Sequence, residues 1–402
     1  MFIKKRLEDL AVFGGDSLFA TPKSTSNLLQ PSFENFLKYS KNIFKERQYT
    51  NNGPNVKLLE KRLSSFHETD FCVTFSSGMW AMVLAISALA IQGNTEIIMP
   101  SLTYRRMDDI ASWAGLKPHF CEVDPKTLAM NAETVEPCIN ENTALILGAH
   151  PIVNCCDIKG LIELSNRHKI PLLFDSVESV YESTSMGKVG QFGNAEAFSL
   201  HACKFLNGFG GGYITTNDEK LSEHLKAVRS FGFVGFDNVA IYGGMNAKLN
   251  EIHAAMALAS LDGVKEQVFL NRERYLAYMR LLADLPGIRL LKFDDDYQVG
   301  YKNIVVEILS DWPLSRLDTL NILNSENILA RAHYYPPLHR KRSKYMNSCD
   351  GLSQTDILAE KFMNLPCGQL VDLNDINKIV EILYFIYSNA DAITNRILRE
   401  FT

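Results

Sequence analysis

Short apolar runs alternate with longer segments of helical spacing through the middle of the chain. Runs rich in Val, Ile, Leu and Phe predict buried β-strands, and apolar positions three or four residues apart predict helices, here over 81–91 and 158–164. This alternation is typical of βαβ units, so we expect an α/β fold with a mainly parallel sheet and helices on both faces. The seven predicted strands are 71–75, 96–99, 119–123, 144–147, 171–174, 195–200 and 212–215.

Beyond residue 218 the pattern becomes helical, first over 250–258 and then through the charged stretch 271–274. A strand over 303–308, a helix over 314–324 and a long helix over 373–390 predict a smaller α+β domain at the C-terminus. We therefore expect three parts. They are an N-terminal segment (1–50), a large domain (51–265), and a linking helix with a small C-terminal domain (266–402).

Composition narrows the class of protein. The 402 residues are 46% hydrophobic and 22% charged, which is enough to bury a large core. A net charge of −5 provides no basic surface, so we expect no nucleic-acid partner. No apolar run reaches the length of a membrane span and no signal peptide is visible, which predicts no membrane contact and a cytoplasmic location.

The chain has eight cysteines, none of them in a CxxC pair. Cys155 and Cys156 are sequence neighbours, which fits neither a zinc framework nor a disulfide scaffold. We therefore predict no metal site and interpret the cysteines mainly as small buried residues.

Asp175 and Lys204 each follow a predicted strand. Taken singly, a lysine there is most often solvated and an aspartate most often caps a turn or helix. Together they match the needs of pyridoxal phosphate, because an amine can hold the aldehyde as a Schiff base and a carboxylate can keep the ring nitrogen protonated. Both lie where strands of an open α/β sheet end and ligands bind.

A phosphate site is predicted at Ser77 and Gly78, directly after the strand 71–75 and at the start of a helix. Free backbone N–H groups and the helix dipole favour an anion there, and glycine permits close approach. A helix N-cap with no ligand is the alternative. Ser199, five residues before Lys204, could add a hydroxyl to the same phosphate.

Two further side chains could contact the pyridine ring. Tyr104 follows the strand 96–99 and could stack on the ring, or it could be an ordinary packing or surface tyrosine. Glu178, three residues after Asp175, could accept a hydrogen bond from the ring hydroxyl, or it could be a solvated glutamate.

With these residues in view, the chain resembles the DegT/StrS sugar aminotransferases, which are fold type I pyridoxal phosphate enzymes. The likeness covers nearly the whole sequence. It rests on four motifs, which are Tyr49-Thr-Asn-Asn-Gly-Pro54, Ser199-Leu-His-Ala-Cys-Lys204, the segment 246–255 beginning Asn-Ala-Lys, and the segment 330–339 containing Arg331 and Tyr334.

The resemblance implies a role for each candidate. Lys204 would form the Schiff base, Asp175 would pair with the ring nitrogen, Glu178 would lie near the ring hydroxyl and Tyr104 would stack on the ring. The phosphate would meet Ser77, Gly78, Met79 and Ser199, together with Asn246 of the neighbouring subunit. It follows that the protein would be a homodimer with shared active sites, with Arg331 and Tyr334 on the substrate side.

The chain departs from the family pattern beside the expected substrate. Met79 and Trp80 stand where most members have a threonine after the glycine, and the loop 150–154 lacks the usual glycine. Arg105 and Arg106 follow Tyr104 in place of small residues, and they could bind an anionic acceptor or be two solvated arginines.

These observations predict a pyridoxal phosphate-dependent aminotransferase that transfers an amino group from an amino acid, expected to be glutamate, to a nucleotide-linked keto-sugar. Lys204 would have to be neutral, so we expect burial and the cationic ring to lower its pKa from about 10.4. An aminotransferase for a cyclitol or another non-nucleotide ketone or aldehyde is one alternative, and a non-catalytic regulatory protein is a second. Retention of Lys204 argues against the second, and also against the family's dehydratases, which have histidine there.

Overall fold

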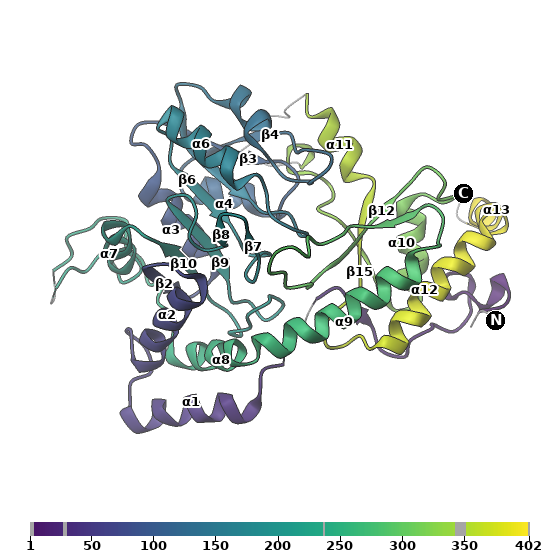
Figure 1. Ribbon diagram of the computed structural model, residues 1–402, viewed down its shortest axis with the longest axis horizontal. Helices are drawn as coiled ribbons and strands as arrows, with labels where there is room; N and C mark the ends of the chain where they lie inside the picture. The colour runs from purple at the N-terminus through teal and green to yellow at the C-terminus, as the bar shows by residue number, and fades with distance from the viewer. Residues whose placement is uncertain (1–3, 27–29, 236–237, 342–350, 401–402) are drawn as a thin grey trace.

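The computed structural model describes residues 4–400 except 27–29, 236–237 and 342–350. Its centre is a seven-stranded sheet (Figure 1) in which β10 runs antiparallel to both neighbours and the other paired strands run parallel. The strands, in spatial order, are β2 (Phe71–Phe75), β10 (Gly212–Thr216), β9 (Ala195–Ser199), β6 (Leu172–Asp175), β5 (Thr143–Ala149), β3 (Glu96–Pro100) and β4 (Lys117–Cys121).

Both faces of this sheet are covered by helices. In β6, Leu172 and Phe174 belong to the core on one face and Leu173 to the core on the other, as the two-residue repeat of a strand requires. The first face packs against α2 (Pro54–His67), α6 (Ile158–His168) and α8 (Glu251–Asp262). The second packs against α3 (Gly78–Leu89), α4 (Met107–Trp113) and α7 (Glu219–Val228). The predicted α/β fold, its seven strands and its helices on both faces are confirmed.

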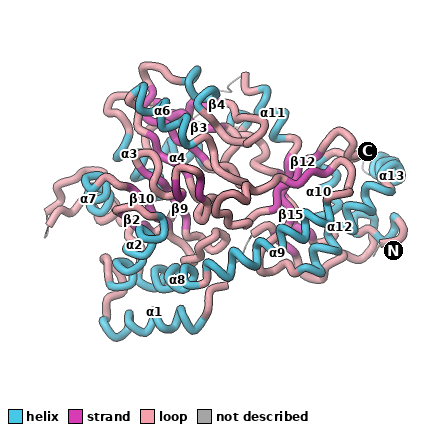
Figure 2. Tube along the Cα trace, in the orientation of Figure 1, coloured by secondary structure: helices cyan, strands magenta, loops and turns pink. Residues whose placement is uncertain are grey.

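Helix α9 (Val264–Leu282) continues from α8 to a second region with its own antiparallel sheet (Figures 1 and 2). The sheet contains, in order, β11 (Ile288–Leu290), β12 (Ile304–Ile308), β15 (Phe362–Leu365) and β14 (Arg331–Ala332). Its helices are α10 (Arg316–Ser325), α11 (Ser353–Ala359), α12 (Leu373–Ser388) and α13 (Ala390–Glu400). The final helix predicted over 373–390 thus ends two residues early, and Asn389 separates it from a further helix.

The first residues of the chain pack into the C-terminal region. Leu10, Phe13 and Phe19 belong to its core, and β1 (Lys23–Ser24) pairs with β13 (Ile328–Leu329). The ammonium of Lys4 lies 3.1 Å from the carboxylate of Glu326. The predicted N-terminal segment is therefore shared between the two regions, because α1 (Phe33–Glu46) packs instead on α8. The three-part domain division stays a prediction.

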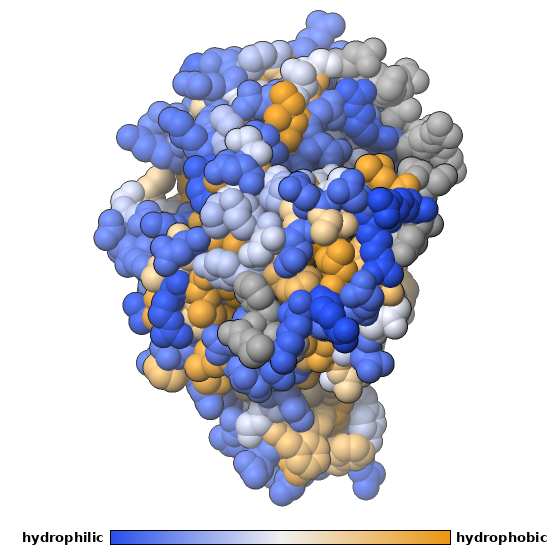
Figure 3. Space-filling model, turned by 90° about the vertical axis from the view of Figure 1, so that its right-hand side faces the viewer, coloured by the Kyte–Doolittle hydropathy of each residue, from blue (hydrophilic) through white to orange (hydrophobic). Residues whose placement is uncertain are grey.

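Helix α1 is apolar on two sides. Tyr39 and Ile43 are buried, while the side chains of Phe33 and Phe44 are 68% and 70% exposed. Figure 3 shows apolar atoms gathered at the lower end of the molecule, which α1 forms in Figure 1. The second side of α1 therefore has no cover within the described chain.

The remaining short elements of the described chain are α5 (Ala132–Val135), β7 (Ser183–Thr184), β8 (Gly187–Lys188) and the 3-10 helices η1 (Leu7–Asp9), η2 (Ala11–Phe13), η3 (Glu136–Cys138) and η4 (Leu338–Arg340). Across the described residues, no helix combines the length and apolar character needed to cross a membrane.

Candidate active site

The carboxyl ends of the central parallel strands carry most of the predicted site residues. Asp175 is the last residue of β6 and Ser199 the last of β9, and the two strands are paired side by side. Lys204 follows in a turn closed by a hydrogen bond from its N–H to the carbonyl of His201 at 2.8 Å. The fold thus brings Asp175 and Lys204 to one edge of the sheet, where open α/β folds bind their ligands.

Glu178 forms ion pairs with two lysines at this edge of the sheet. The ammonium of Lys204 pairs with one carboxylate oxygen, and the ammonium of Lys302 lies 2.6 Å from the other. The side chains are only 19% (Lys204), 14% (Glu178) and 6% (Lys302) exposed. The alternative of a solvated glutamate at position 178 is therefore wrong.

Lys302 and Asn303 had not been identified from the sequence. The amide nitrogen of Asn303 lies 3.4 Å from the Glu178 carboxylate, on the oxygen that Lys302 also contacts. Both precede the apolar strand β12, where a lysine is ordinarily solvated. No sequence signal marks them, because the contact joins residues 124 positions apart.

The ion pairs set the charge of the site. Burial acts to raise the pKa of Glu178, but the positive charges of Lys204 and Lys302 outweigh it and hold that pKa well below its usual range. Burial acts to lower the pKa of Lys204, yet the Glu178 carboxylate raises it overall. In the protein without cofactor the pKa of Lys204 is therefore raised, because a neighbouring anion favours the charged amine more than burial opposes it. The lowering expected beside the cationic ring stays a prediction.

Asp175 has a different environment from Glu178. Burial raises the pKa of Asp175 to about 6, although the N–H of Val177 and the charge of Lys204 act against this rise. That N–H donates to the carboxylate of Asp175 at 3.2 Å. Above pH 6 the group is an anion in a site of low polarity, which suits pairing with a protonated ring nitrogen.

A buried polar cluster of His150 and Cys156 packs against the end of β6, the strand that carries Asp175. The sequence does not indicate this cluster. The ring of His150 stacks on Phe174 with centroids 5.3 Å apart, and its backbone N–H donates to the carbonyl of Asp175 at 3.1 Å. The sulfur of Cys156 lies 3.3 Å from Nδ1 of His150. This cluster stiffens the end of β6.

The start of α3 forms a cradle against the end of β9. The side chain of Ser77 accepts the N–H of Trp80 at 3.1 Å, so Ser77 is the N-cap of α3, and its contact with a phosphate stays a prediction. A β-carbon on Gly78 would lie 3.0 Å from that of Ser199, and one on Gly212 would lie 2.4 Å from the α-carbon of Gly78. Only glycines allow this approach.

The cradle also fits a phosphate. Its helix is 12 residues long, and in the described chain the N–H groups of Gly78 and Met79 have no hydrogen-bond acceptor. The Ser199 hydroxyl lies beside them. A helix N-terminus with free N–H groups and a hydroxyl favours an anion, so the residues present fit the phosphate of pyridoxal phosphate while Asp175 fits its ring nitrogen.

Two tyrosines border the site. Tyr104 follows β3 and is 49% exposed. Tyr334 comes from the C-terminal region, and burial together with the carboxylates of Glu178 and Asp175 raises its pKa. Tyr334 therefore faces the site, whereas Arg331 is exposed on β14.

Arg105 and Arg106 lie on the surface before α4. The Nε of Arg106 is 2.6 Å from Asp109, and the carbonyl of Arg105 accepts a hydrogen bond from Lys341 at 3.0 Å. Arg106 therefore already has a counterion, while the side chain of Arg105 extends from a segment anchored through its backbone. Binding of an acceptor by either arginine stays a prediction.

Asn246 is exposed at the end of an arm whose described residues are 230–235 and 238–246, and the two ends of the arm pair through Ser230 and Asn246. The next residue, Ala247, accepts the N–H of Ser76 at 2.7 Å. The arm thus leaves the molecule beside the start of α3. Its contact with a second subunit stays a prediction.

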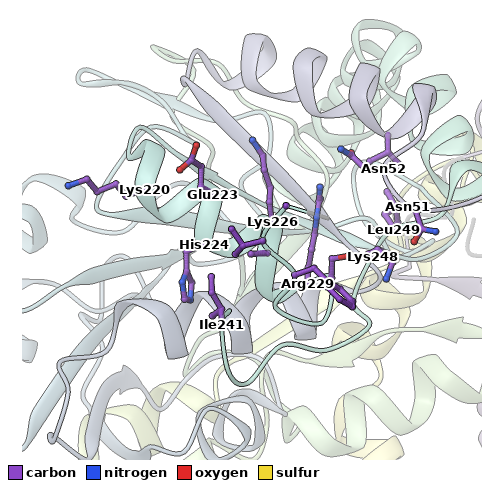
Figure 4. A pocket seen from close by; sticks show the side chains of 16 residues that line it. Asn51, Asn52, Lys220, Glu223, His224, Lys226, Arg229, Ile241, Lys248 and Leu249 are labelled. Carbon is purple, nitrogen blue, oxygen red and sulfur yellow. The ribbon is translucent and has the colours of Figure 1, made fainter. Parts of the chain in front are cut away.

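A cavity of about 750 Å³ lies beside this arm (Figure 4). Its basic lining residues include Lys226, Arg229 and Lys248. Arg229 is held by Glu60 and by the carbonyl of Thr74 at 2.6 Å. The cavity therefore adds positive charge to the surface from which the arm extends.

Comparison with known proteins confirms the resemblance. The family model described as the DegT/DnrJ/EryC1/StrS aminotransferase family matches residues 32–384. A Shigella dysenteriae protein named dTDP-4-amino-4,6-dideoxy-D-glucose transaminase is 29% identical over 339 residues, which is 84% of this chain and 91% of the relative. GDP-perosamine synthase of Vibrio cholerae is 23% identical over 342 residues, or 84% and 92% of the two chains.

Among solved structures, DesI in the presence of its TDP-sugar product is similar over 97% of this chain and 99% of its own, with a TM-score of 0.91 and 28% identity. The likeness thus extends from the sequence motifs to the arrangement of both regions. The predicted enzyme class and cofactor are confirmed with the family. The chain belongs to the DegT/DnrJ/EryC1/StrS aminotransferase family, whose members use pyridoxal phosphate.

Proposed function

We propose that this protein transfers the amino group of an amino-acid donor, glutamate, to the keto group of a nucleotide-linked sugar. The observation that carries the proposal is the meeting of Asp175, Glu178 and Lys204 at one sheet edge beside a phosphate cradle. The relatives' names support the acceptor class, because they specify sugars linked to dTDP, TDP or GDP. A cytoplasmic location stays a prediction.

In this proposal each residue has a distinct task. Pyridoxal phosphate supplies the aldehyde carbon that receives the amino group and a ring that takes up electrons. Lys204 anchors that carbon and, once released, its Nζ removes the proton from the substrate carbon that carries the amino group. Asp175 keeps the ring nitrogen protonated, and Ser199 with the N–H groups of Gly78 and Met79 binds the phosphate.

The remaining tasks concern the ring and the acceptor. Glu178 accepts a hydrogen bond from the ring hydroxyl, and Tyr104 stacks on the ring. Tyr334 and Arg331 lie on the acceptor side, with Arg105 near the entrance.

We further propose a homodimer in which Asn246 of each chain reaches the partner's phosphate. The exposed apolar side chains of the arm and of α1 support it, because water would otherwise contact Phe231, Val239 and Phe44, which are 47%, 55% and 70% exposed. A second copy would cover them, and symmetry would give each copy the same shared site.

Reductive trapping tests the cofactor assignment. The purified protein should be yellow, and borohydride should attach the cofactor covalently to the peptide that contains Lys204. Lys302 is the control, since it is also an amine within the site. An adduct on Lys302, or a colourless protein that pyridoxal phosphate cannot reconstitute, would refute the role of Lys204.

A panel of acceptors tests the substrate. Nucleotide-linked keto-sugars should react with the amino form of the enzyme, while cyclitol ketones and the same sugars without nucleotide should not. Turnover only with a ketone that lacks a nucleotide would instead indicate an aminotransferase for a cyclitol or another non-nucleotide ketone or aldehyde. A protein that binds cofactor but transaminates nothing would favour a regulatory role.

A further inference from the structure

Glu178 is the meeting point of two buried amines that reach it from different regions. Lys204 approaches from the loop after β9, while Lys302 approaches from the residue pair that precedes β12 in the C-terminal region. Each ammonium contacts a different carboxylate oxygen, with Lys302 at 2.6 Å. Lys302 is buried more deeply than Lys204, with a side chain that is 6% rather than 19% exposed.

This arrangement has a consequence once Lys204 is used by the cofactor. Its nitrogen then faces the aldehyde carbon and can no longer serve Glu178 as a free ammonium ion. A buried carboxylate that loses its counterion tends to take up a proton, because the charged form is poorly solvated. Lys302 has no such second task, so its ion pair with Glu178 remains.

We propose that Lys302 is a positioning residue that keeps Glu178 ionised and in place after Lys204 has turned to the cofactor. The inference rests on the role of Lys204 proposed above. Through Lys302, the C-terminal region would thus help to decide whether Glu178 is ionised when the cofactor is bound. Asn303, 3.4 Å from the same carboxylate oxygen, would fix the direction of that oxygen.

Three other ionisable groups around the site are neutral near pH 7, so the charge beside Glu178 is set by the lysines and carboxylates. Burial lowers the pKa of His333 to about 4 and raises that of Cys367 to about 11, so both are neutral near pH 7. Burial and nearby carboxylates likewise keep Tyr334 neutral by raising its pKa. The remaining groups that face the cluster are Asp175, Cys203, Tyr104, His150, Arg274 and Arg316.

The test uses Lys302→Met, with Lys302→Arg as the charge-preserving variant and Lys292→Met as a matched control at an exposed lysine. The first measurement is the visible absorption of the loaded protein against pH. Without Lys302 the Glu178 carboxylate should take up a proton, so the anion next to the Lys204 nitrogen is lost together with the more distant cation, and the midpoint should fall by about half a pH unit in Lys302→Met. Lys302→Arg should recover most of that shift, and Lys292→Met should match the parent.

The second measurement does not depend on turnover. Cofactor-free protein is mixed with pyridoxal phosphate and cyanoborohydride at pH 8, and labelling of Lys204 is followed by peptide mass. Without Lys302 the whole charge of Glu178 acts on Lys204, so less of its amine is neutral and labelling should slow about tenfold. Unchanged midpoint and labelling rate in a folded Lys302→Met protein would overturn the inference, as would Lys302→Arg behaving like Lys302→Met.

A double-mutant cycle shows whether Lys302 acts through Glu178. In a Glu178→Gln background, Lys302→Met should no longer lower the midpoint, because the carboxylate that would take up the proton is already gone. A full shift in that background would overturn the positioning role. If the parent itself is not labelled at Lys204, the proposed function fails first, so the two failures are distinguishable.

Discussion

The sheet edge at Asp175 and the arm, described over residues 230–235 and 238–246, are built in opposite ways. At the edge, Glu178, Lys204 and Lys302 satisfy one another within a single chain and are largely hidden from water. On the arm, Tyr242 is 96% exposed and Asn246 is exposed at the base. The difference teaches that the charged groups at the edge find their partners within one chain, whereas the arm leaves apolar side chains exposed, as the proposed homodimer would require.

The largest expected effect lies at the sheet edge. Asp175→Asn should retain the cofactor but lose on the order of a hundredfold or more in transamination rate, because the ring nitrogen loses its anionic partner. Rates should be compared with cofactor content in the same preparation. A variant within twofold of the parent would remove Asp175 from the mechanism.

The arm is tested by complementation. Lys204→Ala and Asn246→Ala homodimers should both be strongly impaired, but a mixed dimer receives both lesions in one pocket and neither in the other. Random pairing makes about half the dimers mixed, so activity should recover to roughly a quarter of the parental value. The control is co-expression of each variant with itself. No recovery, although mixed dimers form, would mean that Asn246 does not serve the partner's pocket.

Arg105 and Arg106, which precede α4, allow a comparison, within the described chain, between an arginine without a counterion and one that has a counterion. Arg106 is paired with Asp109, whereas the side chain of Arg105 is not fixed by such a contact in the described chain. Arg105→Gln should therefore raise the KM for the acceptor about tenfold, the value of one charge-assisted hydrogen bond, and Arg106→Gln should raise it less. The donor half-reaction is the internal control. Equal changes in both half-reactions would favour two solvated arginines.

The smallest effect concerns stability. Because the folded-state pKa of Asp175 is raised to about 6 from its ordinary value of 3.8, its ionised form costs stability above pH 6 and this cost disappears as the pH falls toward 4. Cofactor-free Asp175→Asn should thus melt a few degrees higher than the parent at pH 7.5 and at nearly the same temperature at pH 4. A midpoint below that of the parent at pH 7.5 would show that the carboxylate stabilises the empty site.

Much of the fold could be predicted because its signals are local. The strands of the central sheet are short apolar runs, and Asp175 and Lys204 follow two of them. Lys302 could not be predicted, because its partner Glu178 is 124 residues away and only the fold brings the segment before β12 against it. The break at Asn389 also escaped prediction, since both flanking segments are helical.

The raised pKa of Lys204 in the protein without cofactor also could not be predicted from the sequence. Burial can be inferred from a neighbouring apolar strand, but the Glu178 carboxylate that outweighs it is visible only in three dimensions. Roles for Tyr104, Arg331 and Asn246 stay predictions, because the described contacts of one chain do not test them.

The pairing of the N-terminal segment with residues 327–329 has a consequence for synthesis. Asn327 donates a hydrogen bond to the carbonyl of Phe19, a residue that leaves the ribosome 308 residues earlier. At about 5–20 residues per second, the first segment waits roughly 15 to 60 s for its partner strand. Meanwhile the central sheet can fold, so Leu10 and Phe13 must remain exposed as nascent chain, where a chaperone would find them.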